Sequence, residues 1–322
     1  MRFGLIATIS ALTLASFGPG GAAAQSYPSK PIRMIVAYAP GGAVDFVART
    51  VAQRMTESMG QTIVVENKPG AGGILAADTV VHSAPDGYTV LFTDPAIATA
   101  PSLQEKVPYD LFKDFKTVSV TSSSPNVLIV ANSLPVKIVS ELIAYGKQNP
   151  GKLNYASSGI GTSVHLAAEM LKASTGIEAT HVPYRGMAQS MTDLADGKVH
   201  MAFSSPSAAM PLISGNKVRA IATTGNQRSP AFPDLPTVAE AGVPGFYVDL
   251  WTAVFVPAAT PQNIVTKLSD ELRKALSNPE TKAALAKVGT EPRGTTLEEG
   301  AAFVHSEHDR WRKVIKDAKI QQ

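Results

Sequence analysis

Cysteine is absent from the whole chain of 322 residues. Its absence excludes a disulfide framework, a thiolate metal site and a lipid anchor attached through an N-terminal cysteine. Positive and negative charges nearly balance: the formal net charge is +3, and the sequence contains no run of Lys or Arg. We therefore expect no nucleic-acid partner. The composition, 44% hydrophobic and 17% charged, is that of a globular protein with a sizeable core.

Apolar runs long enough to span a membrane are missing as well. Arg2 precedes a short apolar stretch that Gly18 and Pro19 interrupt, and three alanines at 22–24 follow. A basic start, a short apolar middle and a small-residue site are typical of a secretory signal. We expect residues 1–24 to be a signal peptide cleaved near Ala24. The mature chain is then soluble and exported, and periplasmic if the source is Gram-negative.

Strands and helices alternate after the signal. The apolar run 32–38 predicts a strand buried on both faces, and apolar residues from Val44 to Met55 recur at helical spacing until Gly60. A strand at 62–66, a helix at 74–81 and a strand at 88–93 complete a βαβαβ unit. Such a unit predicts a parallel sheet.

A second unit with the same pattern begins near residue 127. Strands are expected at 127–131, 153–156, 178–182, 199–203 and 218–223, and helices at 139–148, 163–174 and 187–195. Four prolines at 229–245 then predict a rigid connection with little helix.

The end of the chain has too few elements for a third domain. After a strand at 251–256, Thr260 and Asn278 each precede a proline, as helix N-caps do, and Thr296 with Glu299 forms a capping box. We expect these elements to pack on the first unit. One lobe then comprises 25–125 and 247–322, the other comprises 126–246, and a cleft lies between them.

Three loops rich in glycine stand before helices, at 40–42, 69–73 and 159–163. Ligands bind at the carboxyl ends of strands in open α/β sheets, and free N–H groups at a helix start favour anions. The first and third loops occupy the same place in each lobe, so we expect a small anion to bind between them. The second loop is interpreted as a tight turn only.

Polar side chains near these loops leave alternatives open. The hydroxyls of Ser157, Ser158, Thr162 and Ser163, and the imidazole of His165, can donate to a carboxylate or serve as helix caps. Asp45 stands in the first turn of the first expected helix. It either organises the loop amides or binds a ligand amine or a bridging water.

Other candidate residues have weaker support for a functional role. Arg185 follows a strand and is either a cleft-facing cation for a carboxylate or a surface residue. Tyr184 and Trp251 are aromatic lids or core packing. His305 and His308 lack a third ligand, so no metal site is predicted. The chain has no third glycine for a dinucleotide fingerprint, no Gly-Lys-Ser/Thr and no Gly-x-Ser-x-Gly, so neither a cofactor nor a catalytic residue is predicted.

Several linked motifs resemble those of the Bug/TctC-type proteins, the substrate-binding components of tripartite tricarboxylate transporters. The matching segments are Tyr27-Pro28-x-x-Pro31-Ile32, Ala39-Pro40-Gly41-Gly42-x-x-Asp45-x-x-Ala48-Arg49, Val65-Glu66-Asn67-Lys68-Pro69-Gly70-Ala71-Gly72-Gly73, Pro85-Asp86-Gly87-Tyr88, His181-Val182-Pro183-Tyr184-Arg185-Gly186 and Leu235-Pro236-Thr237-Val238-x-Glu240-Ala241-Gly242. They extend over nearly all of the mature chain.

The resemblance implies two doubly wound α/β lobes with a hinge, as in type II periplasmic binding proteins. It implies an organic acid as ligand, namely a dicarboxylate, tricarboxylate or aromatic carboxylate, and delivery to membrane permease subunits by a monomer. The candidate ligand-binding residues are Tyr38, Gly41, Gly42, Ala43, Asp45, Ser157, Gly161, Thr162, Ser163, His165, Arg185 and Ser204.

Two positions depart from the family pattern. Val44 stands where the family often has a hydroxyl or amide residue, and Ser204 with Ser205 stands where many members have Asp. Both changes favour a less polar ligand, such as an aromatic carboxylate. Two alternative functions stay open: a sensor component that presents its ligand to a periplasmic receptor domain, and an exported hydrolase that uses the same cleft. The missing nucleophile motif disfavours the hydrolase.

Overall fold

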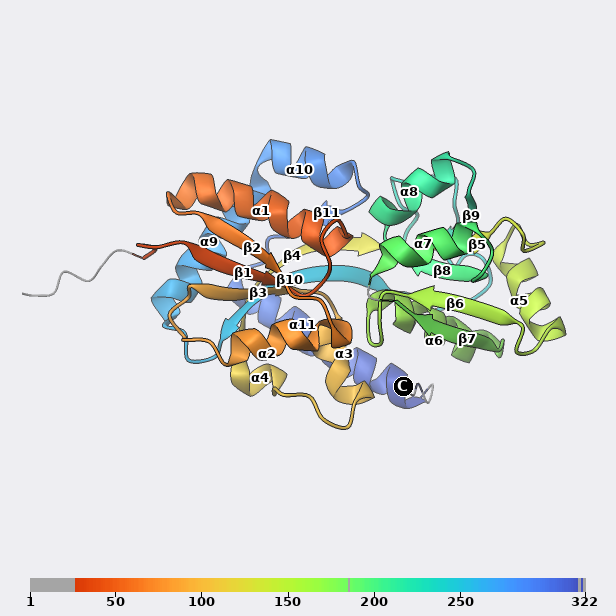
Figure 1. Cartoon of the computed structure of the whole chain (residues 1–322), viewed down its shortest axis with the longest axis horizontal. Coiled ribbons are helices and arrows are strands. Elements are labelled where there is room, and N and C mark those ends of the chain that lie inside the picture. Colours follow the sequence, from red (N-terminus) through yellow and green to blue (C-terminus); the bar gives the residue numbers. More distant parts are fainter. Residues whose placement is uncertain (1–26, 185, 318–319, 321–322) are drawn as a thin grey trace, which may run out of the picture.

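The computed structural model describes residues 27–184, 186–317 and 320. These residues form two lobes, each built on one β-sheet flanked by helices (Figure 1). The expected signal peptide, residues 1–24, and the candidate Arg185 lie outside the described residues. In the described part of the chain, no helix is both long and apolar enough to cross a membrane.

The first lobe contains a mixed sheet with the order β11-β4-β10-β3-β1-β2. Its strands are β1 (Ile32–Val36), β2 (Ile63–Asn67), β3 (Thr89–Thr93), β4 (Phe115–Pro125), β10 (Asp249–Pro257) and β11 (Glu291–Pro292). β1 pairs in parallel with β2 and β3, as the βαβαβ pattern predicted. The sheet as a whole is mixed, because β10 runs antiparallel to both β3 and β4. β4 leads the chain into the second lobe and β10 brings it back, so the two strands run in opposite directions.

Helices cover both faces of this sheet. They are α1 (Ala43–Met59), α2 (Ile74–Val81), α3 (Ala96–Leu103), α4 (Leu111–Asp114), α9 (Gln262–Ser277), α10 (Pro279–Ala286) and α11 (Leu297–Asp317), with a short 3-10 helix, η1 (Ala71–Gly73), before α2. Met34 and Val36 share a core cluster with residues of α1 and α9, whereas Ile35 packs in a cluster with residues of α2 and α3. Successive side chains of β1 thus enter opposite cores, as expected of a strand buried on both faces.

The second lobe has a sheet of order β7-β6-β8-β5-β9. Its elements are β5 (Val127–Ala131), α5 (Val139–Gln148), β6 (Leu153–Ser157), α6 (Ser163–Thr175), β7 (Ala179–Pro183), α7 (Met187–Ala195), β8 (Met201–Ser204), α8 (Pro206–Ser214) and β9 (Val218–Thr223). β6 is parallel to β7 and β8, but β5 is antiparallel to β8 and β9. The carboxyl ends of β6, β7 and β8 therefore point the same way, and each of them leads toward the start of a helix.

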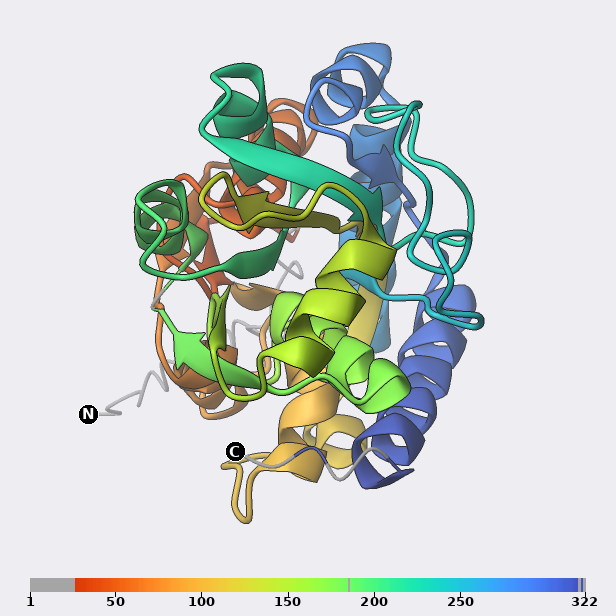
Figure 2. The same cartoon turned by 90° about the vertical axis from the view of Figure 1, so that its right-hand side faces the viewer.

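Two connections join the lobes. The chain passes from β4 to β5 at Asn126 and returns through residues 224–248, a stretch without helix or strand, as its prolines predicted. Figure 2 shows this second connection and α11 on the same side of the molecule. Trp311 and Ile315 of α11 pack in the core of the second lobe, although the helix also contacts α3 and β4 of the first. The C-terminal helix therefore lies against both lobes.

The predicted helix caps were correct at two of three positions. Asn278 accepts hydrogen bonds from the N–H groups of Glu280 and Thr281, and Thr296 and Glu299 bond reciprocally. The prediction for Thr260 was wrong, because Pro261 itself is the N-cap residue of α9 and has extended backbone angles (φ −56°, ψ 138°).

Candidate functional site

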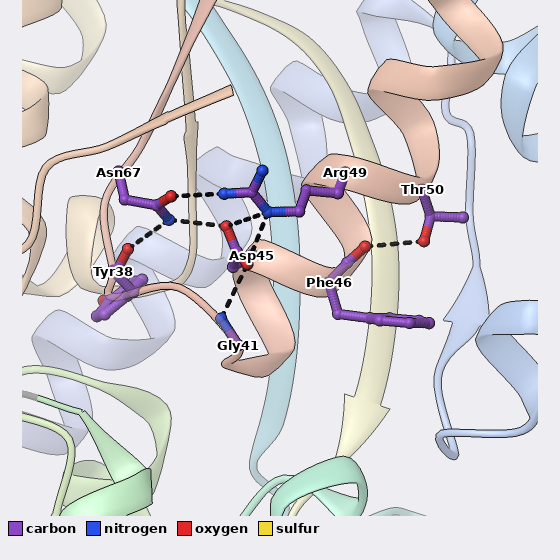
Figure 3. Close-up of polar contacts among 7 residues, drawn as sticks. All are labelled: Tyr38, Gly41, Asp45, Phe46, Arg49, Thr50 and Asn67. Atoms are coloured by element: carbon purple, nitrogen blue, oxygen red, sulfur yellow. Dashed lines mark hydrogen bonds and ion pairs between the residues drawn. The ribbon is translucent and has the colours of Figure 1, made fainter. Parts of the chain in front are cut away.

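The first glycine loop is held in shape by a buried carboxylate. Gly41 has φ +84°, in the left-handed region that glycine favours, and its N–H donates to Oδ2 of Asp45 at 2.9 Å (Figure 3). Asp45 is 3% exposed and lies in the first turn of α1. Of the roles considered for Asp45, this geometry matches that of an organiser of the loop amides.

Arg49 and Asn67 complete a network around Asp45. Nε of Arg49 lies 3.0 Å from both carboxylate oxygens, and Nδ2 of Asn67 donates to Oδ1 at 2.7 Å. Asn67 also donates to the backbone carbonyl of Tyr38 at 2.9 Å, so the end of β2 is tied to the end of β1 (Figure 3). Burial alone would raise the pKa of Asp45, but the hydrogen bonds from Arg49, the Gly41 N–H and Asn67 lower it. The carboxylate is thus ionised and fully engaged.

The N-terminus of α1 keeps open amides beside this loop. Its N-cap residue, Gly42, provides no side chain, and the first helical hydrogen bond runs from the N–H of Phe46 to the carbonyl of Gly42. The N–H groups of Ala43, Val44 and Asp45 precede that bond and have no intrahelical acceptor. The side chain of Val44 is buried in the core of the first lobe, so this departure from the family pattern does not present a valine side chain to the ligand.

Tyr38 lies between the first and second loops. Its hydroxyl donates to Oδ1 of Asp94 at 2.6 Å, and the same oxygen accepts the N–H of Ala96 at 2.9 Å. Asp94 is 3% exposed, and burial raises its pKa to about 6 although both hydrogen bonds act in the opposite direction. The tyrosine is therefore fixed by a buried group that follows β3.

The third glycine loop leaves the N-terminus of α6 open too. The N-cap residue, Thr162, does not cap with its side chain; its hydroxyl donates instead to the carbonyl of Gly159 at 2.7 Å. Ser163 is 1% exposed and its hydroxyl has no hydrogen-bond partner among the described residues. Because the first helical bond runs from Leu166 to Thr162, the amides of residues 163–165 have no intrahelical acceptor. Neither hydroxyl serves as a helix cap.

The two lobes touch at all three glycine loops. Thr99 of α3 donates to the carbonyl of Gly161 at 2.8 Å. A Cβ on Gly72 of the second loop would lie 2.4 Å from the carbonyl oxygen of Ile160, and one on Gly186 would lie 3.9 Å from Cβ of Ala39. The interpretation of the second loop as a tight turn only was therefore incomplete, because the absence of a side chain at Gly72 also lets the third loop approach.

A cavity of about 310 Å³ lies where the second and third loops meet. It is lined from the first lobe by Tyr38, Gln104 and residues 69–73, and from the second lobe by residues 158–160, Pro183 and Tyr184. The hydroxyl of Tyr184 is directed to Asp193 at 2.8 Å. Trp251 is fully buried and donates to Glu307, so it is a core residue and no lid.

Among the described candidate ligand-binding residues, only Tyr38 lines this cavity, and Arg185 lies outside the described residues. Ser204 ends β8, is fully buried, and its hydroxyl donates to the carbonyl of Ser205 at 3.3 Å. His165 is 1% exposed, beneath the third loop rather than on its surface. Within the described residues, no group of three or more His, Asp or Glu side chains is placed to hold a metal ion.

Several residues of this arrangement carry a signal in the sequence. Asn67 ends β2 and Asp94 follows β3, where the carboxyl ends of parallel strands place ligand-site residues. Arg49 stands four positions after Asp45, which is the spacing of an ion pair on one helix face. Thr99 carried no such signal, since its partner is 62 residues away in the other lobe.

Two α/β lobes that meet over a cavity, lined by loops of both lobes, define the architecture of a solute-binding protein. The chain matches the model of the tripartite tricarboxylate transporter family receptor, TctC, over residues 47–320. It belongs to this family. A curated relative, the UPF0065 protein in the tcbD-tcbE intergenic region of Pseudomonas sp. strain P51, is 38% identical over 297 residues, which are 92% of this chain and 88% of the relative.

Solved structures of similar proteins share the fold. Rpa4515 of R. palustris, solved with adipate, has a TM-score of 0.88 at 38% identity over 92% of this chain and 99% of its own. The periplasmic binding protein BugD has a TM-score of 0.87 at 34% identity over 92% and 99%. MatC of Rhodopseudomonas palustris, with bound malate, has a TM-score of 0.85 at 33% identity over 90% and 100%. The predicted two-lobed fold and the Bug/TctC resemblance are thus confirmed.

Proposed function

We propose that this chain is an exported receptor that binds a small organic carboxylate between its two lobes and delivers it to permease subunits of a tripartite transporter. The mature protein begins near Gln25, after cleavage at Ala24, and acts in the periplasm as a monomer. Residues 25–125 and 247–322 form one lobe and residues 126–246 the other. The ligand is a dicarboxylate, a tricarboxylate or an aromatic carboxylate.

One observation carries the proposal: α1 and α6, helices of 17 and 13 residues, both start without a side-chain cap, each at a loop that borders the interface of the lobes. A helix start has a partial positive charge and several N–H donors that point outward. Two such ends on opposite lobes suit a molecule with an acid group at each end. The similar proteins solved with adipate and with malate, both dicarboxylates, support this choice of ligand class.

The proposed ligand contacts divide between the lobes. In the first lobe, the amides of Gly42 and Ala43 receive one carboxylate, while Asp45 and Tyr38 keep the loop and the cavity wall in place. In the second lobe, the amides that follow Thr162 receive the other end, with the free hydroxyl of Ser163 as a further donor. Gly41, Gly161 and Arg185 are further proposed contacts. Ser157, His165 and Ser204 were candidates from the sequence, but their side chains are 0%, 1% and 0% exposed, so the proposal does not include them as ligand contacts.

No covalent chemistry is part of this proposal. The family and the similar solved proteins are binding proteins. A serine and a histidine do meet in the second lobe, since Oγ of Ser157 lies 2.6 Å from Nε2 of His181. Ser157 is, however, 0% exposed, and its hydroxyl bonds within the third loop. This position does not suit a nucleophile that must reach a substrate.

Calorimetry on the mature chain tests the binding step. Adipate, malate, citrate and benzoate are each titrated, with adipamide as an uncharged control of the same length as adipate. We expect at least one acid to bind and to raise the melting temperature by mass action, and the diamide to do neither. Equal binding of acid and diamide, or no binding of any acid, would overturn the carboxylate proposal.

Transport experiments test the delivery step. Uptake of the labelled acid is compared in cells that lack this chain, cells that lack the permease subunits, and cells that have both. We expect uptake to require both components. If uptake persists without this chain while a transcriptional response to the acid is lost, the chain is a sensor component.

A further inference from the structure

Three aromatic rings contact one another beneath the third glycine loop. The ring of His181 stacks on that of Tyr155 with centroids 4.7 Å apart, and it is tilted by 32° against that of His165 with centroids 4.4 Å apart. Tyr155 is 0% and His165 is 1% exposed. The rings come from β6, β7 and α6, so this cluster joins the three elements that surround the loop.

His165 accepts a hydrogen bond from the loop above it. The N–H of Gly161 points to Nδ1 of His165, with 3.2 Å between the nitrogens. Nδ1 can accept this bond only in the neutral ring with its proton on Nε2. Gly161 has φ +82°, so its amide direction depends on a conformation that the histidine helps to hold. The bond therefore fixes the residue immediately before the N-cap of α6.

His181 holds the beginning of the same loop. Its Nε2 lies 2.6 Å from Oγ of Ser157, and that hydroxyl accepts the N–H of Gly159 at 3.1 Å. The Ser157 hydroxyl has one proton and two acceptors nearby, the Gly159 carbonyl at 3.3 Å and Nε2 at 2.6 Å, and the shorter distance favours donation to Nε2 of the neutral ring. Thr162 closes the loop from the other side by donating to the carbonyl of Gly159. The two imidazoles thus contact both ends of the segment 157–161.

Burial, more than the charged groups around the cluster, keeps both imidazole rings neutral. Glu169 of α6 accepts from the hydroxyl of Tyr155 and from Lys172, whose ammonium lies 5.5 Å from the tyrosine ring centre. Burial is the main cause that lowers the pKa of His165 to about 3, and the neighbouring His181 and Lys172 add to it. Burial also lowers the pKa of His181 to about 4, against the opposing effect of Glu169. The neutral tautomers that the loop requires are therefore present at neutral pH.

We infer that His165 and His181 are positioning residues, which fix the amides of the third loop for the ligand without touching the ligand themselves. The inference rests on the proposed function for the ligand, but the geometry of the loop does not depend on it. In this role each imidazole is the hydrogen-bond partner of a loop group, the Gly161 N–H or the Ser157 hydroxyl, that would otherwise need a partner within the loop. The loop can then leave the N-terminus of α6 free of a side-chain cap and still hold one conformation. The cost of a flexible loop, which would have to be ordered on binding, is avoided.

Paired substitutions separate hydrogen bonding from packing. His165→Asn keeps an acceptor near the place of Nδ1, and His181→Gln keeps one near Nε2, whereas His165→Leu and His181→Leu fill the space without an acceptor. We expect the Asn and Gln variants to bind adipate or malate within about threefold of the wild type, and the Leu variants about tenfold more weakly. Melting temperatures of all four report on folding. A purely structural role would lower binding only in proportion to the loss of folded protein.

Amide hydrogen exchange of Gly159 and Gly161 gives a readout that needs no ligand. We expect exchange at both glycines to be faster in the Leu variants and close to wild type in the Asn and Gln variants. Equal exchange and equal affinity in Leu and Asn variants would overturn the inference. If the wild type binds none of the four acids, the proposed function fails, and the exchange comparison still decides whether the histidines hold the loop.

Discussion

Thr99 and Gly161 are joined by a hydrogen bond that crosses from one lobe to the other, with 2.8 Å between the hydroxyl and the carbonyl oxygen. Thr99 is fully buried in α3, and Gly161 belongs to the third glycine loop. The bond exists only when the lobes are together. It therefore links the closed arrangement directly to the loop that precedes α6.

Replacement of Thr99 by valine removes this bond while it keeps the shape of the side chain. A neutral hydrogen bond contributes about 0.5–1.5 kcal/mol, so we expect Thr99→Val to weaken carboxylate binding by about two- to tenfold. Thr99→Ser keeps the hydroxyl and should bind close to wild type. Calorimetry on the three proteins measures the difference, and small-angle scattering measures the lobe separation. If valine and serine variants bind equally, the hydrogen bond has no part in closure.

Gly72 tests the approach of the second loop to the third. A Cβ at this position would lie 2.4 Å from the carbonyl oxygen of Ile160, a backbone atom that cannot move away alone. We expect Gly72→Ala to keep the lobes apart and to weaken ligand binding at least tenfold, roughly the effect of 1.4 kcal/mol.

The matched control for this variant is Gly151→Ala. Gly72 and Gly151 have similar angles, φ +62° and +72°, but a Cβ on Gly151 meets no atom within 4 Å. Both variants share the backbone strain of alanine in the left-handed region, and only the first adds the clash with Ile160. Scattering curves and affinities of the two proteins are compared. Closure of Gly72→Ala as complete as that of the control would refute the tight approach of the loops.

Gly42 tests the open amides at the start of α1. Its φ is −81° and an added Cβ would make only an ordinary contact, 3.7 Å from the carbonyl oxygen of Ala39. We expect Gly42→Val to fold normally and to lose carboxylate binding, because the branched side chain covers the amides of the first turn. Gly42→Ala should show a smaller loss. Affinity and melting temperature are measured for both; unchanged affinity in the valine variant would place the ligand away from α1.

The sequence predicted the elements that hydrophobic periodicity marks, and it missed those that the partner lobe determines. Strand β1 and helices α1 and α6 have clear apolar spacing. The capping box was predicted from the spacing of Thr296 and Glu299 alone. The antiparallel direction of β10 could not be predicted in this way, because it depends on where the chain re-enters the sheet after the 123 residues 126–248.

The candidate site was predicted at the first and third loops, whereas the cavity between the lobes is lined by residues of the second and third. Glycine at 41–42 and 159–161 pointed to ligand approach, but the role of Gly72 depends on Ile160, a residue of the other lobe. The same holds for His165, whose imidazole reads as a ligand donor in sequence and lies beneath the loop in the structure. Local patterns give the position of a residue along an element, and only tertiary packing decides which side of a loop it occupies.

Asp94 provides a prediction on the pH dependence of stability. Burial raises the pKa of its carboxyl from 3.8 to about 6 in the folded chain. Between these values the folded state holds a proton that the unfolded state releases, so its contribution to the free energy of unfolding is full below about pH 4 and is lost as the pH rises through 6. The loss amounts to about 2–3 kcal/mol for a change of roughly two units.

Asp94→Asn removes this dependence and keeps an acceptor for Tyr38 and Ala96. The lowered pKa values of His165 and His181 act in the opposite direction between about pH 6.5 and 3, so the measured quantity is the difference in unfolding free energy between wild type and variant. Urea unfolding is measured from pH 4 to 7. We expect the wild type to lose about 2–3 kcal/mol of unfolding free energy relative to the variant over this range. The exposed Asp309→Asn, as a control, should give a constant difference. Parallel profiles for Asp94→Asn would mean that the carboxyl is solvated in the folded protein, and Tyr38 would then lack the fixed acceptor that holds it at the cavity wall.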